Sequence, residues 1–207
     1  MPWARRLISS IAVHMPLHAD GEVFEVNIVD FLMLETLRVF EPNLHEALFR
    51  QRDLVLQTMR FRGDGWRDAD KAVAEQLIRI VPDERRTVAR DALKELFPTL
   101  EWAFGGANYD EGFNSTWLAG KRVCTSRYFP RYFELQTAAG EVSERSFMSF
   151  LAATSDEDQM AAAIAGIEAN GLLPSLVARF DESVDRLPVE NAAVLLPAMF
   201  KIGQKLA

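Results

Sequence analysis

Hydrophobic positions recur three and four residues apart along most of this chain, which is the period of an α-helix with one buried face. In the stretch beginning at Asp68, for example, the apolar side chains of Ala69, Val73 and Leu77 fall on one stripe. Proline, glycine and helix-capping residues interrupt the pattern every few turns. The sequence therefore predicts an all-α fold, a multi-helical array of antiparallel helix pairs. Helices are expected at residues 3–15, 28–40, 43–57, 68–81, 83–97, 143–152, 155–169, 172–180 and 189–205.

Local residue pairs predict where some of these helices begin and end. The pair Asp20-Gly21 predicts a turn after the first helix. Asn43 followed by Glu46 resembles a capping box, in which two side chains bind free backbone amides of the first turn. Ser155 stands directly before three acidic residues, which suit the positive end of a helix dipole. Helix starts are therefore expected at Asn43 and Ser155.

The middle of the chain departs from the helical period. Residues 98–140 are rich in aromatic side chains and are interrupted by glycine and proline, so an irregular aromatic-rich segment is expected there. Residues 134–207 hold 11 acidic and 5 basic side chains, a net charge of −6. The sequence thus predicts a helical region over residues 1–140 and an acidic C-terminal helical subdomain, residues 141–207, packed on it.

Composition and charge narrow the class of protein. With 207 residues, 49% hydrophobic and 26% charged, the chain can bury a core and is not expected to be disordered. A net charge of −7 argues against coating DNA or anionic membranes by bulk attraction. No apolar stretch is long enough to span a bilayer, so no membrane insertion is expected. The single cysteine and the absence of a signal peptide indicate a cytoplasmic protein.

The common catalytic motifs are missing from the sequence. It contains no G-x-x-x-x-G-K-[ST], G-x-G-x-x-G, G-x-S-x-G, H-E-x-x-H or C-x-x-C. Each motif positions the backbone amides, nucleophile or metal ligands that its chemistry requires. This chain by itself is therefore not expected to be an enzyme, to hydrolyse nucleotides, or to hold a cofactor or metal.

The remaining nucleophilic and metal-binding side chains are isolated along the chain. His14 and His18 have the spacing of a helical metal-binding pair, but Pro16 between them disfavours the continuous helix that such a pair needs. His45 is expected at the surface of its helix. Cys124 has basic neighbours that would lower the pKa of its thiol, so a cysteine hydrolase is one alternative. The simpler interpretation makes Cys124 a small, semi-buried residue.

The stretch from Gly112 to Phe133 combines positive charge with aromatic rings and contains no acid after Glu111. Such a combination binds single-stranded nucleic acid by neutralising phosphates and stacking on bases, which makes a nucleic-acid-binding module the alternative function. The candidate binding residues are Lys121, Arg122, Arg127, Tyr128, Arg131 and Tyr132. A structural interpretation stays open beside it: the rings anchor an irregular segment to the core while the arginines pair with acids on nearby helices.

Several segments resemble the KAP family of P-loop NTPases. Residues 26–42, VNIVDFLMLETLRVFEP, are similar to the segment that follows the nucleotide-binding core of that family. Residues 122–133, RVCTSRYFPRYF, are similar to its arginine-plus-Tyr-Phe motif. Residues 140–143 and 5–8 resemble parts that flank these segments in the family, in the same order. Pro130 departs from the acidic or polar residue expected at its position.

The resemblance implies that the chain is the C-terminal helical part of a KAP-type NTPase, or a truncated product of one. It would act as a non-catalytic accessory domain that couples nucleotide state to a partner or docks a partner. The implied partner is an NTPase core in cis or a separate protein. ATP and Mg²⁺ would be bound by that core alone, because the family's phosphate-binding and magnesium-binding motifs are absent from this chain.

Two further expectations follow from the resemblance. Arg5 and Arg6, at the junction with such a core, would reach a nucleotide phosphate as charge-assisted donors; the alternative is that they are ordinary helix-surface residues. The KAP family includes bacterial phage-exclusion proteins, which implies a bacterial cytoplasmic protein and a role in phage defence. The oligomeric state is left open.

Overall fold

A computed structural model describes residues 2–56, 66–107, 109, 111–135, 140–184 and 187–206, and it confirms the all-α fold. Internal contacts divide the chain into two units, Met1–His18 with Val26–Gln136, and Ala19–Glu25 with Thr137–Ala207. The division at residue 137 lies near the boundary expected at residue 140. The sequence did not predict that residues 19–25 belong with the C-terminal unit.

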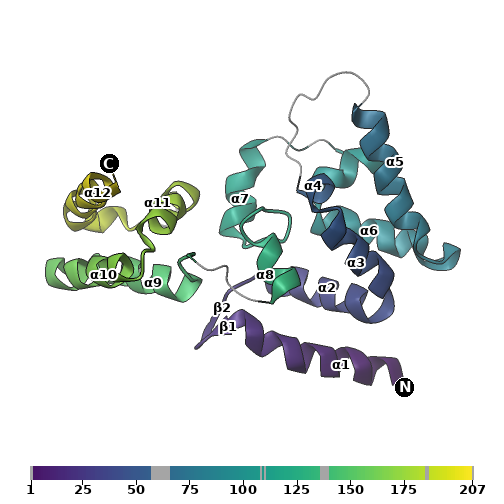
Figure 1. Ribbon diagram of the computed structural model, residues 1–207, viewed down its shortest axis with the longest axis horizontal. Coiled ribbons are helices and arrows are strands. Elements are labelled where there is room, and N and C mark those ends of the chain that lie inside the picture. Colours follow the sequence, from purple (N-terminus) through teal and green to yellow (C-terminus); the bar gives the residue numbers. More distant parts are fainter. Residues whose placement is uncertain are drawn as a thin grey trace. The chain divides into compact units, whose positions relative to one another are not determined.

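The first unit is built from α-helices and short 3-10 helices, the latter labelled η. Its elements are α1 (Pro2–His14), η1 (Met15–His18), α2 (Ile28–Phe40), α3 (Pro42–Arg50), α4 (Arg52–Val55), α5 (Trp66–Arg79), η2 (Asp83–Arg85), α6 (Arg86–Leu96), η3 (Pro98–Phe104), η4 (Glu111–Phe113), α7 (Asn114–Ala119) and α8 (Phe129–Glu134) (Figure 1). The irregular segment expected over residues 98–140 therefore contains several short helices.

The capping box expected at Asn43 is wrong. α3 begins one residue earlier, with Pro42 in its first turn, where the missing amide of proline costs no hydrogen bond. Asn43 therefore lies inside the helix. The long helix expected over residues 43–57 is divided at Gln51 into α3 and α4, and residue 57 lies outside the described residues.

α2 is the central helix of the first unit. Asn27 caps its N-terminus, because its side-chain oxygen accepts hydrogen bonds from the amides of Val29 (3.0 Å) and Asp30 (3.2 Å). The face that carries Phe31 and Leu34 is buried. The cap and the buried stripe explain why the helix keeps the bounds that the sequence predicts.

An ion pair between the buried Asp30 and the half-buried Arg122 joins α2 to the turn that precedes α8. Asp30 is 1% exposed and accepts hydrogen bonds from Nε of Arg122 (2.8 Å) and from the amide of Val123 (2.8 Å). Arg122 also donates to the backbone carbonyl of Glu95 on α6. Burial raises the pKa of Asp30, and the two hydrogen bonds act against that shift. Three elements of the unit therefore meet at Asp30 and Arg122.

Tyr132 on α8 makes a second link to the start of α2. Its hydroxyl accepts from the amide of Asn27 (2.7 Å) and donates to the carbonyl of Lys121 (2.7 Å). The guanidinium of Arg38 donates to the carbonyl of Tyr132 (3.3 Å). Residues 26–42 and 122–133 thus pack against each other in the core of this unit.

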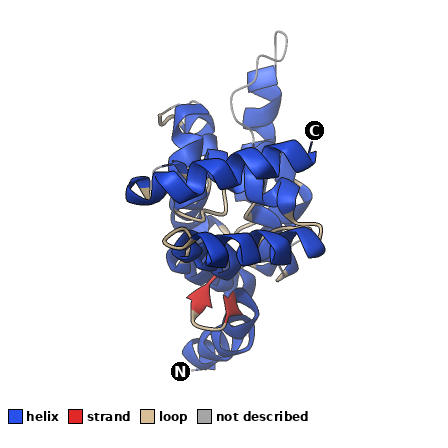
Figure 2. Cartoon of the chain, turned by 90° about the vertical axis from the view of Figure 1, so that its left-hand side faces the viewer, coloured by secondary structure: helices blue, strands red, loops and turns tan. Residues whose placement is uncertain are grey.

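The second unit contains one short hairpin and a group of helices. Its elements are β1 (Ala19–Asp20), β2 (Val23–Phe24), α9 (Glu144–Ala153), α10 (Glu157–Ala169), α11 (Leu173–Glu182), η6 (Val189–Asn191) and α12 (Ala192–Leu206) (Figure 1). The strands, drawn in red in Figure 2, pair antiparallel with Ala19 opposite Phe24. Gly21 closes the hairpin at φ 64°, which confirms the predicted turn.

Buried acids organise the second unit as well. The Glu25 carboxylate, directly after β2, accepts hydrogen bonds from the first amides of α9, those of Glu144 (2.7 Å) and Arg145 (3.2 Å). The side chain of Glu144 forms a buried ion pair with Arg179 of α11. The Arg179 guanidinium lies 4.6 Å from the ring centre of Phe147. The hairpin is therefore tied to the helices through Glu25.

The apolar core of the second unit lies between α9, α10, α11 and α12. It is formed by Val142, Phe147, Phe150, Met160, Ile164, Ile167, Leu173, Leu176, Phe180, Leu195, Ala198 and Ile202. Asp156, one residue after the expected Ser155, caps α10 by accepting from the amide of Gln159 (2.8 Å). The acidic residues around Ser155 therefore mark the helix start, as the dipole argument predicts.

Replacing Asp30 by Asn tests the link between α2 and Arg122. We expect Asp30→Asn to lower the free energy of unfolding by about 3 kcal/mol, because Arg122 keeps its charge while its buried partner is removed. Urea denaturation measures the change. The matched control is Glu95→Gln, which removes an exposed carboxylate 3.8 Å from the same arginine and should cost less than about 0.5 kcal/mol. Equal effects of both variants would contradict the role of Asp30.

Candidate functional site

The candidate nucleic-acid-binding residues lie in α8 and in the turn before it. Tyr128, Arg131 and Tyr132 are buried. The guanidinium of Arg131 lies 5.0 Å from the ring centre of Tyr128, and the ring of Tyr132 lies 6.1 Å from that of His18. These rings face other side chains of the protein, so they offer no stacking platform to a base in this structure.

The other three candidates, Lys121, Arg122 and Arg127, are half-buried. Lys121 adopts the left-handed region at φ 54°, which turns its carbonyl toward Tyr132. Arg122 is held by Asp30, and Arg127 is engaged in contacts of its own. The structure thus brings the six residues together within the packed part of the first unit. This arrangement favours the core-anchoring interpretation of the segment.

Arg5 and Arg6 lie on α1 and are exposed. The guanidinium of Arg6 lies 5.3 Å from the ring of Trp3, which is the geometry of a cation–π contact. α1 itself contains no buried residue. Its half-buried positions are 7, 10, 11 and 14, and they form the one face that packs on α2.

Apolar side chains on α1 extend beyond the face that α2 covers. Ile8 and Val13 are 65% and 64% exposed, and Trp3, which lies on the α2 side and contacts Phe40, is 55% exposed. At 100° per residue, Ile8 and Val13 lie on opposite flanks of the helix. Met15 and Leu17, in η1, are exposed as well. We call these five residues the N-terminal apolar surface. Single exposed apolar residues are ordinary, but such a concentration indicates an interaction surface.

Glu35 makes the polar contact between α1 and α2. Its buried carboxylate accepts hydrogen bonds from Oγ of Ser10 (2.6 Å) and pairs with Nδ1 of His14 (2.8 Å), both on α1. Nε of Arg38 lies 3.2 Å from the other carboxylate oxygen. No sequence motif marks Glu35 as a contact residue. The available indication was its position, an acid on a largely apolar helix, where a buried carboxylate calls for a partner.

Two histidines pack against aromatic rings of the first unit, His18 buried and His45 half-buried. His18 contacts the ring of Phe31 at 5.1 Å, and His45 contacts the ring of Phe133 at 4.9 Å. His45, expected at the surface of its helix, is half-buried beside Phe133 of α8. Burial lowers the pKa of both imidazoles to about 4, so both are neutral at pH 7.

The pair His14 and His18 does not share a helix. α1 ends at His14, and the 3-10 turn that follows contains Pro16, as the proline argument predicts. Across the described residues, no group of three or more His, Cys, Asp and Glu side chains is arranged to hold a metal ion.

Cys124 is buried next to the Asp30–Arg122 pair. Burial raises the pKa of its thiol to about 12, and the opposing effect of Arg122 is smaller. The basic neighbours that suggested a reactive thiolate therefore do not determine its protonation. This geometry favours the interpretation of Cys124 as a packed residue.

A groove of about 440 Å³ lies between α2 and α6. Its lining is mostly apolar and includes Phe40 and the exposed Val88, with the ion pair of Glu41 and Arg85 (2.9 Å) at its border. The ring of Phe40 also contacts Trp3 at 5.8 Å. The N-terminal apolar surface therefore adjoins a second apolar region of the same unit.

No family model, curated protein or solved structure matches this chain.

In the described chain, no single helix has the length and apolar composition to cross a membrane. The pair α10 and α11 reaches that length and composition when taken together, but its axes differ by 119°.

His18 and His45 predict an acid-dependent loss of stability. Their folded pKa values of about 4 lie below the unfolded value of 6.5, so the unfolded chain binds protons first as pH falls. We expect each histidine to cost about 2 kcal/mol between pH 7 and pH 5. Urea denaturation at both pH values measures the loss. The double variant His18→Gln, His45→Gln should lose less stability between pH 7 and pH 5 than the wild type. An equal loss in the variant would contradict the role of the two histidines.

The burial of Cys124 predicts slow chemical modification. In the native protein the thiol should react with a mild thiol reagent at least about a hundredfold more slowly than in the urea-unfolded chain, because both access and thiolate formation are suppressed. Mass spectrometry over time gives both rates. Rapid labelling of the native chain would revive the cysteine-hydrolase alternative.

Proposed function

We propose that this chain is a non-catalytic helical accessory domain that binds a partner protein through α1. One observation carries the proposal: the apolar side chains of α1 extend around more of the helix than α2 covers. A helix that is apolar on several sides is stable when other protein surrounds it. The N-terminal apolar surface is thus suited to a second body that packs over α1.

The partner we propose is the core of a KAP-type P-loop NTPase, in cis or as a separate protein. This choice is supported by the similarity of residues 26–42 and 122–133 to that family. Arg5 and Arg6 lie exposed on the same helix, where guanidinium groups would be available to a nucleotide bound by the partner. ATP and Mg²⁺ would be held by the core, and this chain would contribute binding and charge.

The contacts of α1 supply a route for regulation in this proposal. Ser10 and His14 hold α1 on α2 through Glu35, and Asp30 on the same helix holds the turn before α8. A partner that shifts α1 would disturb the buried carboxylate of Glu35. Because a buried carboxylate must keep its partners, α2 would respond to that shift. The domain would in this way relay the nucleotide state of its partner.

The nucleic-acid-binding alternative receives no comparable support. Its stacking residues Tyr128 and Tyr132 are buried, and Arg122 is occupied by Asp30. For this reason the partner-binding function is preferred.

Site-specific photocrosslinking in the native cells tests the proposal. Benzoylphenylalanine placed at Ile8 or Val13 should give an adduct with a P-loop-containing segment, within the same polypeptide for a core in cis and with a second polypeptide for a separate protein, because these exposed positions lie on either side of the face of α1 that packs on α2. The control position is Val189 of η6, which is 81% exposed and lies in the other unit. Mass spectrometry identifies the adducts. Equal adducts at Val189, or adducts at α1 with proteins that lack a P-loop, would contradict the proposal.

A second measurement addresses the two arginines. With the captured partner in hand, Arg5→Gln, Arg6→Gln should lower the ATPase rate of the complex by about tenfold while leaving the crosslink at Ile8 intact. An unchanged rate would assign both residues to the ordinary helix surface.

A further inference from the structure

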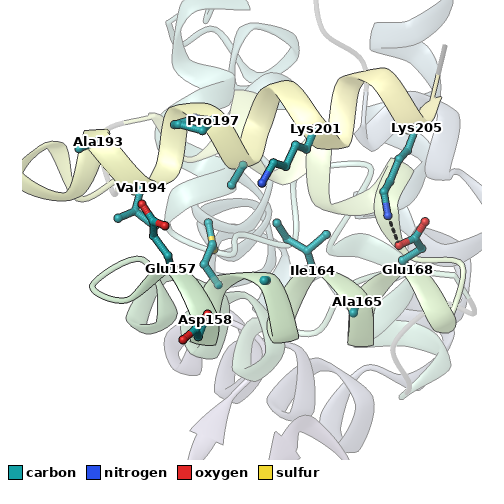
Figure 3. A pocket seen from close by; sticks show the side chains of 13 residues that line it. Glu157, Asp158, Ile164, Ala165, Glu168, Ala193, Val194, Pro197, Lys201 and Lys205 are labelled. Carbon is teal, nitrogen blue, oxygen red and sulfur yellow. Dashed lines mark hydrogen bonds and ion pairs between the residues drawn. The ribbon is translucent and has the colours of Figure 1, made fainter.

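A groove of about 400 Å³ runs between α10 and α12 of the second unit (Figure 3). Its apolar lining includes Met160 and Ile164 from α10, and Val194, Pro197 and Ala198 from α12. Ligand sites commonly measure roughly 300 to 1,000 Å³ and are mostly apolar with a few placed polar groups. The groove has the size of such a site, and its lining also holds five charged side chains, those of Glu157, Asp158, Glu168, Lys201 and Lys205.

Charged side chains stand at both ends of the groove. At one end the ammonium group of Lys205 pairs with Glu168 across the gap, and at the other Glu157 extends toward Val194 (Figure 3). The stretch of α12 from Ala193 to Lys201 borders the open part and spans about 12 Å at 1.5 Å per residue. The open part is thus a short apolar channel with defined ends.

Lys201 projects into this channel from α12 (Figure 3). Among the described residues no acid lies within ion-pair distance of it, whereas Lys205, one turn further on, is paired. Lys201 therefore places a positive charge above an apolar floor. An anion bound there would gain a charge-assisted hydrogen bond, and its apolar part would displace water from the floor.

We propose that the groove binds a single-chain alkyl monocarboxylate of medium length, such as decanoate. The carboxylate pairs with Lys201, and the chain lies along Pro197 and Val194 toward Glu157. The carboxylate of Glu157 disfavours a second anion at that end, so the site selects a monoanion with an apolar tail over a dicarboxylate. This inference concerns the second unit and is independent of the partner proposed for α1.

Charge complementarity with Lys201 is the selective element. The C-terminal region is acidic, with a net charge of −6 over residues 134–207, so an anion approaching it meets an unfavourable field. α12 itself carries no acid, and Lys201 supplies the local positive charge at the groove. Without Lys201 the groove would retain its apolar floor and would lose its preference for a negative head group.

Titration of the full chain with decanoate, below its critical micelle concentration, tests the proposal. Calorimetry should show saturable binding, and amide resonances of residues 157–168 and 193–205 should shift in two-dimensional NMR spectra. Two probes separate the contributions: acetate has the head group without the chain, and decyltrimethylammonium has the chain with the opposite charge. Neither should bind measurably. Equal binding of decyltrimethylammonium, shifts spread over the whole chain, or no binding of decanoate would overturn the proposal.

Two lysine variants complete the test. Lys201→Met keeps the apolar stem and removes the charge, so the dissociation constant for decanoate should rise by about tenfold or more. Lys205→Met removes the charge that is already paired with Glu168 and should change the constant by less than about twofold. Circular dichroism checks that both variants fold. Wild-type affinity in Lys201→Met, or an equal loss in Lys205→Met, would show that Lys201 is not the recognition group.

Discussion

The arrangement of the helices in the first unit depends on two buried carboxylates, each of which must be paired or hydrogen-bonded. α2 carries both of them, Asp30 and Glu35, on a helix that is otherwise largely apolar. An ionised carboxylate withdrawn from water is costly unless it is paired and hydrogen-bonded. Asp30 is satisfied by Arg122 and the turn before α8, and Glu35 is satisfied by His14 and Ser10 of α1. The contacts of Glu35 therefore hold α1 on α2, and the contacts of Asp30 hold the turn before α8 on the same helix.

The second unit uses the same principle with a different geometry. Glu25 follows a short strand and binds the exposed amides at the start of α9, while Glu144 in the first turn of that helix pairs with Arg179 of α11. Two acids at one helix terminus thus join the hairpin, α9 and α11. Hydrophobic burial supplies the larger share of stability, but it is non-directional. The buried acids add the directional contacts that select one arrangement of the helices.

Because these charged side chains pair inside the protein, the candidate binding surfaces lie elsewhere. The arginines and tyrosines of residues 121–132 are the most evident binding candidates in the sequence. In the structure they make ion pairs, hydrogen bonds and packing contacts inside the first unit. The surfaces left for binding are of another kind. One consists of apolar side chains on both flanks of α1, and the other is a groove between α10 and α12 into which Lys201 projects, with no acidic partner among the residues that the structure describes. Neither surface carries a conspicuous sequence motif. Both are defined by what neighbouring elements leave uncovered.

The sequence by itself determined the all-α class and most helix positions, because periodicity, caps and turns act over a few residues. α2 came out with its expected bounds, and Gly21 closes the turn that its pair with Asp20 predicts. Tertiary structure alone decided that Tyr132 is buried, that Cys124 holds its proton, and that residues 19–25 belong with the C-terminal helices. The partners responsible lie about 100 residues away in the chain, as Asn27 lies from Tyr132, and no local pattern encodes which distant groups will meet.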